Sequence, residues 1–226
     1  MSWFKRHRDD APVDAKPVAA QQKGAPDPEQ AAHAFWRRWV ELLPEISAAL
    51  GDREPQRFED ALCAAVSAMH PDLHFAVERG QRAIYALVVT GQEDPALRRY
   101  TDAWKAAAPE ESPFWEYHDS VPPVPDPNEV TVNIGEHRIP LADVRVVALV
   151  DEADGVVDVA VYHPKMAELT DPMRQAMTFL PLDATLGERL AGSRLRRVET
   201  ALVEPANAIT LTEFRDLVSQ LDTPAD

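Results

Sequence analysis

The chain has 226 residues, of which 45% are hydrophobic, so it is long enough to bury the core of one sizeable domain. Its formal net charge is −15. This charge argues against a general binder of phosphate backbones, because such proteins gather lysine and arginine on one surface, and we expect no nucleic acid partner. The single cysteine, Cys63, excludes an internal disulfide and suits a reducing compartment.

Two features of the sequence bear on its cellular location. No apolar run approaches the roughly 20 residues of a spanning helix, and the N-terminus lacks the apolar segment of a signal peptide. Arginine outnumbers lysine by eighteen to five, which is typical of a GC-rich bacterial genome. We therefore expect a cytoplasmic bacterial protein. Cys63 lies beside Leu62 and Val66 in a helical pattern, so we expect its thiol to fill the core.

Residues 1–28 differ from the rest in composition. They hold five basic and four acidic side chains among Pro, Ala and Gln, with almost no apolar pattern, and this predicts a disordered N-terminal tail. Trp3 and Phe4 precede Lys5-Arg6-His7-Arg8, a composition that also occurs at membrane interfaces. Because so short a patch gives only weak adsorption, we favour disorder over membrane contact.

Two amphipathic helices are predicted next. Asp27-Pro28 supplies an N-cap and a first-turn proline for a helix that Pro44 is expected to bend or end. Aromatic side chains at helical spacing are more often core than a ligand platform, and we assign that role to Phe35, Trp36 and Trp39. A second helix over 55–69 follows after Gly51-Asp52 and predicts a helical hairpin.

The middle of the chain has the pattern of strands. Residues 73–90 predict a β-hairpin, Asp94-Pro95 opens a helix that Pro109 stops, and 114–118 predicts a short strand. The proline-rich segment 121–127 indicates a stiff, extended connection rather than a recognition motif for a partner. Residues 129–163 are the most apolar stretch and predict a four-stranded β-meander with a turn at Asp154-Gly155.

The last third is predicted to be mostly helical. Asp171-Pro172 opens a helix that we expect Pro181 to end, although leucines continue at helical spacing to Gly192. A strand is predicted over 195–203, and Thr210 with Glu213 forms a capping box for a final helix. The order of hairpin then helix at 73–108 recurs at 144–180, which we interpret as a chance recurrence of a common unit.

The histidines are the candidate catalytic residues. His118, His137 and His163 lie on or at the ends of predicted strands, where each has the chemistry of a general base beside Glu116, Glu136 or Asp158. Sequence does not show whether they converge, and an ordinary sheet histidine is the favoured interpretation of each. The spacing of His70 and His74 resembles a metal motif, but Pro71 lies between them, so we predict neither a metal site nor a cofactor.

One glycine stands out. Residues 187–193 resemble part of a phosphate-binding glycine loop but lack its lysine, so we interpret them as a helix ending. Gly187 in an apolar helical register costs stability, which indicates a packing need rather than a function.

Three short motifs carry a resemblance. Phe35-Trp36-x-x-Trp39, His70-Pro71-Asp72-Leu73-x-Phe75 and Leu182-Asp183-x-x-Leu186-Gly187-Glu188 resemble motifs of uncharacterised bacterial α+β proteins, over residues 30–205. The resemblance implies the fold class and no established activity.

We therefore predict a single α+β domain over 29–226, with a mainly antiparallel sheet and helices packed on one face. The leading functional hypothesis is a non-enzymatic interaction or regulatory protein, such as an immunity-like module that masks a partner. The alternative is a hydrolase or other small-molecule enzyme built from the three histidines. Residues 29–226 carry a charge of −16. A basic protein partner would account for this charge, and solubility alone is the favoured alternative.

Overall fold

The computed structural model describes residues 26–221, and its fold is α+β as predicted, with 46% helix and 23% strand. Antiparallel pairings are the majority among the described strands. The predicted tail, including Trp3 and Phe4, lies almost entirely outside the described residues. Among the helices of residues 26–221, none is long and apolar enough to cross a membrane.

Two helices begin the described chain. In α1 (Pro28–Asp52), the N–H of Gln30 donates to the Asp27 side chain at 3.1 Å, which confirms the predicted cap. We expected Pro44 to bend or end the helix, and the helix does not end there. The carbonyl that loses its donor to this proline belongs to Val40, whose side chain is 62% exposed, so this break lies on the solvent side. After Arg53, in a left-handed conformation, α2 (Gln56–Ser67) packs back on α1.

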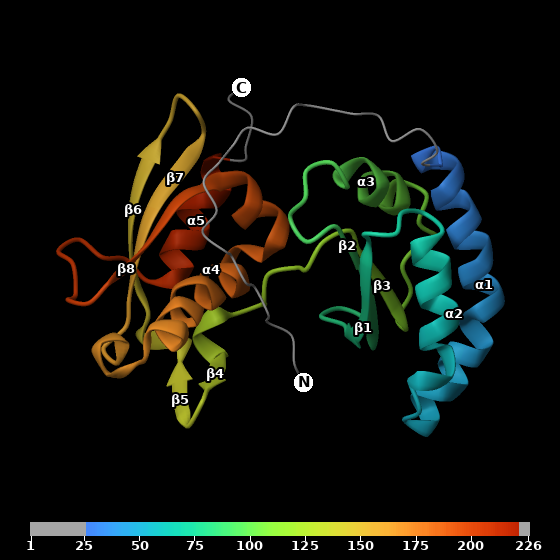
Figure 1. Cartoon of the computed structure of the whole chain (residues 1–226), viewed down its shortest axis with the longest axis horizontal. Helices are drawn as coiled ribbons and strands as arrows, with labels where there is room; N and C mark the ends of the chain where they lie inside the picture. The colour runs from blue at the N-terminus through green and yellow to red at the C-terminus, as the bar shows by residue number, and fades with distance from the viewer. Residues whose placement is uncertain (1–25, 222–226) are drawn as a thin grey trace.

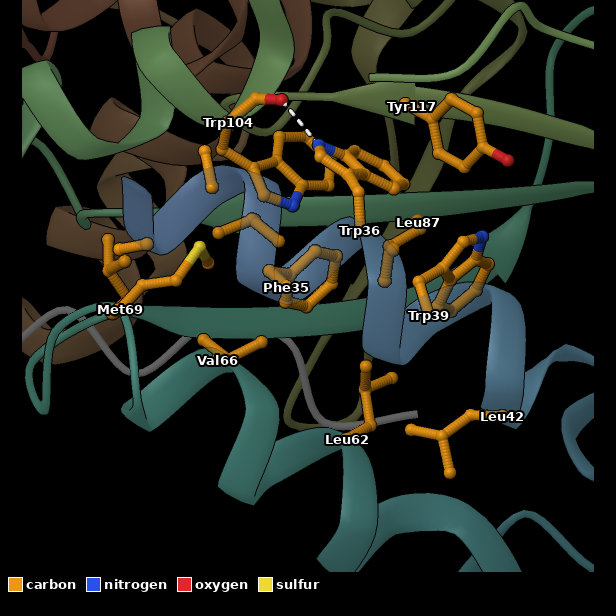
Figure 2. Packing of buried hydrophobic residues seen from close by; sticks show 14 of the residues in the cluster. Phe35, Trp36, Trp39, Leu42, Leu62, Val66, Met69, Leu87, Trp104 and Tyr117 are labelled. Atoms are coloured by element: carbon orange, nitrogen blue, oxygen red, sulfur yellow. Dashed lines mark hydrogen bonds between the residues drawn. The ribbon is translucent and has the colours of Figure 1, made fainter. Parts of the chain in front are cut away.

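The first sheet follows these helices. Strands β1 (His74–Arg79) and β2 (Tyr85–Thr90) pair antiparallel, and α3 (Arg98–Ala106) leads to β3 (Trp115–His118), which pairs parallel with β2. Its core is aromatic, as Figure 2 shows, and the Trp36 indole N–H donates to the Trp104 carbonyl at 2.7 Å. The core assignment of the three α1 aromatics is therefore confirmed.

The second half contains the strands predicted as one meander, which the structure divides. Strands β4 (Thr131–Ile134) and β5 (His137–Pro140) form a two-stranded sheet of their own. Pro140 has no N–H for a ladder, and a 3₁₀ turn at Leu141–Asp143 redirects the chain. Strands β6 (Arg145–Asp151) and β7 (Val156–Tyr162) then form the predicted hairpin, and β8 (Leu195–Ala201) pairs parallel with β7.

Helix α4 (Asp171–Arg194) corrects a second expectation, because it runs through Pro181 instead of ending there. Met177, Leu182 and Leu186 of this helix are buried in the second core, and their burial offsets the roughly 3 kcal/mol that an interior proline costs. The real break is at Gly187, whose φ of 71° and ψ of 165° kink the helix. Helix α5 (Leu211–Leu221) completes this half, with the predicted Thr210–Glu213 capping box in place.

Cys63 is a third correction. Its side chain is exposed, although we placed it in the core beside Leu62 and Val66. Those two neighbours are buried on the α2 face that packs against α1. Cys63 follows Leu62 by one residue, a rotation of about 100°, which turns it to solvent.

The elements form four layers. From left to right in Figure 1 these are the sheet β6-β7-β8, helices α4 and α5, the sheet β1-β2-β3, and helices α1 and α2. Buried apolar residues gather in two clusters, one in each half, where we had expected one sheet and one core. In both halves a hairpin is followed by a helix and then by a third strand, which pairs parallel with the second strand of the hairpin. The recurrence noted in the sequence therefore extends to a complete ββαβ unit.

Candidate functional site

The three candidate histidines lie on or next to three different sheets. His118 is on β3, His137 is on β5, and His163 follows β7. His163 is 1% exposed, and burial lowers its pKa. Its Nδ1 accepts the N–H of Lys165 at 3.0 Å, while its Nε2 is buried without a hydrogen-bond partner in the described chain. None of the three lines either of the cavities described below.

Glu116 and His118 form the one predicted pair of histidine and carboxylate that the structure brings together, with 3.0 Å between Nε2 and Oε1. The carboxylate also accepts the N–H groups of Gln81, Arg82 and Ala83 at 2.8, 2.8 and 3.0 Å. Burial alone raises the pKa of Glu116, but these donors outweigh it and bring the pKa to about 2. Both oxygens are occupied by the β1–β2 turn, so the arrangement holds that turn in place rather than presenting a base.

His70 and His74 do not form a metal motif. His70 is buried and its Nδ1 accepts the N–H of Asp72, whereas His74 lies exposed on β1. Within residues 26–221, no three histidine, cysteine or acidic side chains are arranged to hold a metal ion.

A polar cluster joins the two halves at the kink in α4. Glu188 is 7% exposed, and its carboxylate accepts the Thr90 hydroxyl and the N–H groups of Glu93 and Val121. The neighbouring Arg189 pairs with Asp102 and Asp119 at 2.5 and 2.7 Å. A cavity of about 20 Å³ lies beside this cluster, which is room for about one water molecule. The cluster therefore connects the two halves through the hydrogen bonds of Glu188 and the ion pairs of Arg189.

Gly187 explains why this junction is tight. A Cβ at this position would lie 2.7 Å from the nitrogen of Pro123 in the proline-rich connection, and the φ of 71° is one that side chains rarely adopt. The predicted packing need is confirmed, and the polar contacts of Glu188 that depend on it were not foreseen.

A larger cavity of about 320 Å³ lies between α1 and α2. Its walls are mainly the small side chains of Ala31, Ala34, Ala65 and Ala68, with Phe35 also lining it. It is a mainly apolar groove left by alanines at a helix crossing, and the charged residue in its lining, Arg38, pairs with Glu41 at 2.7 Å.

The outer face of β6-β7-β8 is the most unusual surface. Helices α4 and α5 cover the other face, where the buried Val146, Val157, Val159 and Val161 lie. We call the uncovered side the open sheet face. Five of its side chains on β6 and β7 are apolar and exposed or half-buried: Val147, Leu149, Val156, Ala160 and Tyr162. Asp158 interrupts them, because it lies between Val156 and Ala160 on β7 and pairs with Leu149 across the strands. Leu149 is 67% exposed.

Charged side chains lie among these apolar residues as well as beside them. Arg196 donates to both carboxylate oxygens of Asp158, at 3.0 and 2.9 Å, and to Asp151 at 2.9 Å. These bonds to Arg196 lower the pKa of both aspartates, so the three charges stay paired. Arg197 pairs with Glu199 on β8, and Arg145 lies at the start of β6. The face is thus mixed: apolar side chains on β6 and β7 surround the Asp158–Arg196 ion pair at its centre, and further charges lie at its border.

The sequence contained a signal for this face that we did not use. Residues 146–150 read Val-Val-Ala-Leu-Val, without the alternation expected of a strand that has one solvated side. Continuous apolar runs are typical of strands covered on both faces. In the described chain only one face of β6 is covered.

Comparison with known proteins adds no relative: no protein-family model matches the chain, and neither a curated protein nor a solved structure is significantly similar to it.

Proposed function

We propose that this is a non-enzymatic protein-interaction module that binds a partner through the open sheet face. The observation that carries the proposal is the apolar β6 strand, whose sequence is typical of two covered faces while one face lies open. Binding of a partner would bury Leu149 and its neighbours and remove apolar surface from water. The regulatory, immunity-like role expected from the sequence is one form that such a module takes.

The cellular setting we propose is the bacterial cytoplasm. The chain has one cysteine, and its thiol is exposed, which suits a compartment where thiols stay reduced. A basic partner, suggested by the charge of −15, would associate more slowly as salt rises past roughly 0.15 M, where the Debye length is about 8 Å.

The hydrolase alternative has less support. It requires His118, His137 and His163 to meet in one cleft, and they lie on or next to three separate sheets. Glu116, the best-placed carboxylate, already accepts three backbone N–H groups.

Affinity capture from the native cell tests the proposal. The tagged wild-type chain is compared with Leu149→Asp, which puts a charge at the centre of the open sheet face. The matched control is Val40→Asp on α1, at a side chain of similar exposure, 62% against 67%, in the other half. We expect the wild type and the control to retain the same proteins and Leu149→Asp to lose them. If all three chains retain the same proteins, the open sheet face is not the binding surface and the proposal fails.

A further inference from the structure

The open sheet face has an internal order that points to its partner. Ala148 of β6 pairs with Val159 of β7, and Val159 pairs with Val198 of β8, so these three residues form a straight line across the sheet. On β6 and β7, the outward-facing residues lie at equal distances on the two sides of this line. On β8 the same holds for Arg197 and Glu199, while Ala201 has no counterpart because the register shifts at Val157/Asp158. Consider two copies packed face to face and related by a two-fold axis parallel to this line. Each strand then faces the same strand of the other copy, running in the opposite direction.

That exchange brings complementary side chains together. On β6 it places Arg145 of one copy opposite Asp151 of the other, and Val147 opposite Leu149. On β7 it places Tyr162 opposite Val156. On β8 it places Arg197 opposite Glu199. We infer that the open sheet face binds a second copy of this chain, face to face and with strands reversed, as a two-fold dimer.

The alternative of a basic partner fits this face less well. Arg145, Arg196 and Arg197 lie on it or at its border beside Asp151, Asp158 and Glu199, so a basic protein would meet as many like charges as opposite ones. A second copy would place Asp151 opposite Arg145 and Glu199 opposite Arg197, adding to the pairs that Arg197 makes with Glu199 and Arg196 makes with Asp151 within one chain. Asp158, which would face the small Ala160, is already paired with Arg196.

The size of the face sets the strength of the dimer. Three strands about 4.8 Å apart and seven residues long at about 3.3 Å each give a footprint of roughly 300 Å². Stable interfaces bury about 800 Å² on each partner, so we expect a weak dimer with a dissociation constant of roughly micromolar or higher. Each copy carries −15, so raising salt to about 0.15 M should screen this repulsion and should not weaken the dimer.

This inference rests on the proposed function, and sedimentation velocity on the full chain tests it separately. From about 1 to about 500 μM, a concentration range that spans a weak dimer, we expect the wild type to pass from monomer to dimer. Leu149→Asp should raise the dissociation constant at least about tenfold, because the buried leucine contacts are lost. Val40→Asp should leave it unchanged.

Charge exchange on β8 makes the test specific for the two-fold arrangement. Arg197→Glu alone sets Glu opposite Glu199, and Glu199→Arg alone sets Arg opposite Arg197, so each variant should dimerise more weakly than the wild type. An equal mixture of the two should dimerise as well as the wild type, because both contacts across the axis then join opposite charges. The two side chains are 69% and 52% exposed, so neither change threatens the fold.

Three results would overturn the inference: a wild type that stays monomeric to about 500 μM, a dimer that Leu149→Asp leaves intact, or no recovery in the mixture. A monomeric wild type whose captured proteins still depend on Leu149 would overturn the second copy as partner while leaving the proposed function standing.

Discussion

Glu116 should contribute more to the stability of the first half than any exposed ion pair. Its pKa of about 2, against an ordinary 4.5, corresponds to roughly 3 kcal/mol of stability. The side chain is 1% exposed, so solvent does not screen this contribution. In Glu116→Gln, one carbonyl oxygen must replace two, and the amide NH₂ faces the N–H groups of the β1–β2 turn. Leaving a buried donor unsatisfied costs about 1–3 kcal/mol, which agrees with the linkage value.

Urea unfolding followed by tryptophan fluorescence measures this loss of stability in the first half of the molecule, to which Glu116 belongs. Trp36, Trp39, Trp104 and Trp115 all belong to the first core. With a urea dependence of about 2 kcal/mol per molar, Glu116→Gln should lower the midpoint at pH 7 by roughly 1–1.5 M. Glu111→Gln is the control. Glu111 is 34% exposed and pairs with Arg82 and Lys105, so its loss should cost below about 1 kcal/mol.

The pH dependence of this stabilisation follows from the direction of the pKa shift of Glu116. The folded pKa is depressed, so the stabilisation is fully present above about pH 4.5 and is lost as the pH falls towards 2. At pH 3.5, one unit below the ordinary pKa, the wild type should have lost about 1.4 kcal/mol of its advantage over Glu116→Gln. A midpoint difference below about 0.3 M at pH 7, or a difference that stays constant down to pH 3.5, would refute this account of Glu116.

Three further predictions concern other parts of the chain. Gly187→Ala should destabilise the fold by about 2–4 kcal/mol, because a Cβ there clashes with Pro123 and the φ is positive. Gly51→Ala, which has open space at its Cβ, should instead stabilise α1 by about 0.5–1 kcal/mol, and thermal melts followed by circular dichroism compare the two. Burial lowers the pKa of His163, so the wild type should lose stability as the pH falls below about 6.5, by at most about 1.4 kcal/mol per pH unit. His163→Asn keeps an acceptor for the Lys165 N–H and should remove that part of the slope in urea titrations at pH 7.5 and 5.5; identical slopes would contradict the assignment. Removal of residues 1–26 should leave the melting temperature unchanged, and a fall of several degrees would show that the tail joins the core.

Local signals in the sequence predicted local structure well. The Asp27 cap, the Thr210–Glu213 capping box and the Asp154-Gly155 turn each depend on residues within four positions of one another, and all three are present. Pro44 and Pro181 were interpreted by the same local rule, but neither proline ends its helix. Tertiary burial of the surrounding helix outweighs the local cost of a proline, and a single sequence does not show that burial.

The contacts of buried charges could not be predicted, because they join residues that are distant in the sequence. Glu188 bonds to the Thr90 hydroxyl 98 positions away, and Glu116 bonds to a turn 33–35 positions away. Gly187 was the only sign in the sequence of the contact between Glu188 and Thr90. A glycine in a helical register indicates a close approach of another segment but does not identify that segment. The open sheet face was predictable in principle from the unbroken apolar run of β6. The run was interpreted only as one strand of the meander, without regard to which of its faces is covered.

The two ββαβ units differ in how their helix-free faces are covered, and this difference is the reason that we propose a partner at one end of the molecule. In the first unit that face includes Ala76, Ala86 and Val88, all buried, and Thr90 bonds to Glu188 of the second half. In the second unit the same face carries Leu149 and is open. A head-to-tail partner on this face would leave another open face on the next copy, and the assembly would grow into a filament. Two-fold pairing covers both faces at once and stops there. A dimer that does not grow further at high concentration is therefore the expected outcome, and a sedimentation profile that continues to larger species would contradict the two-fold arrangement while keeping the open sheet face as the contact.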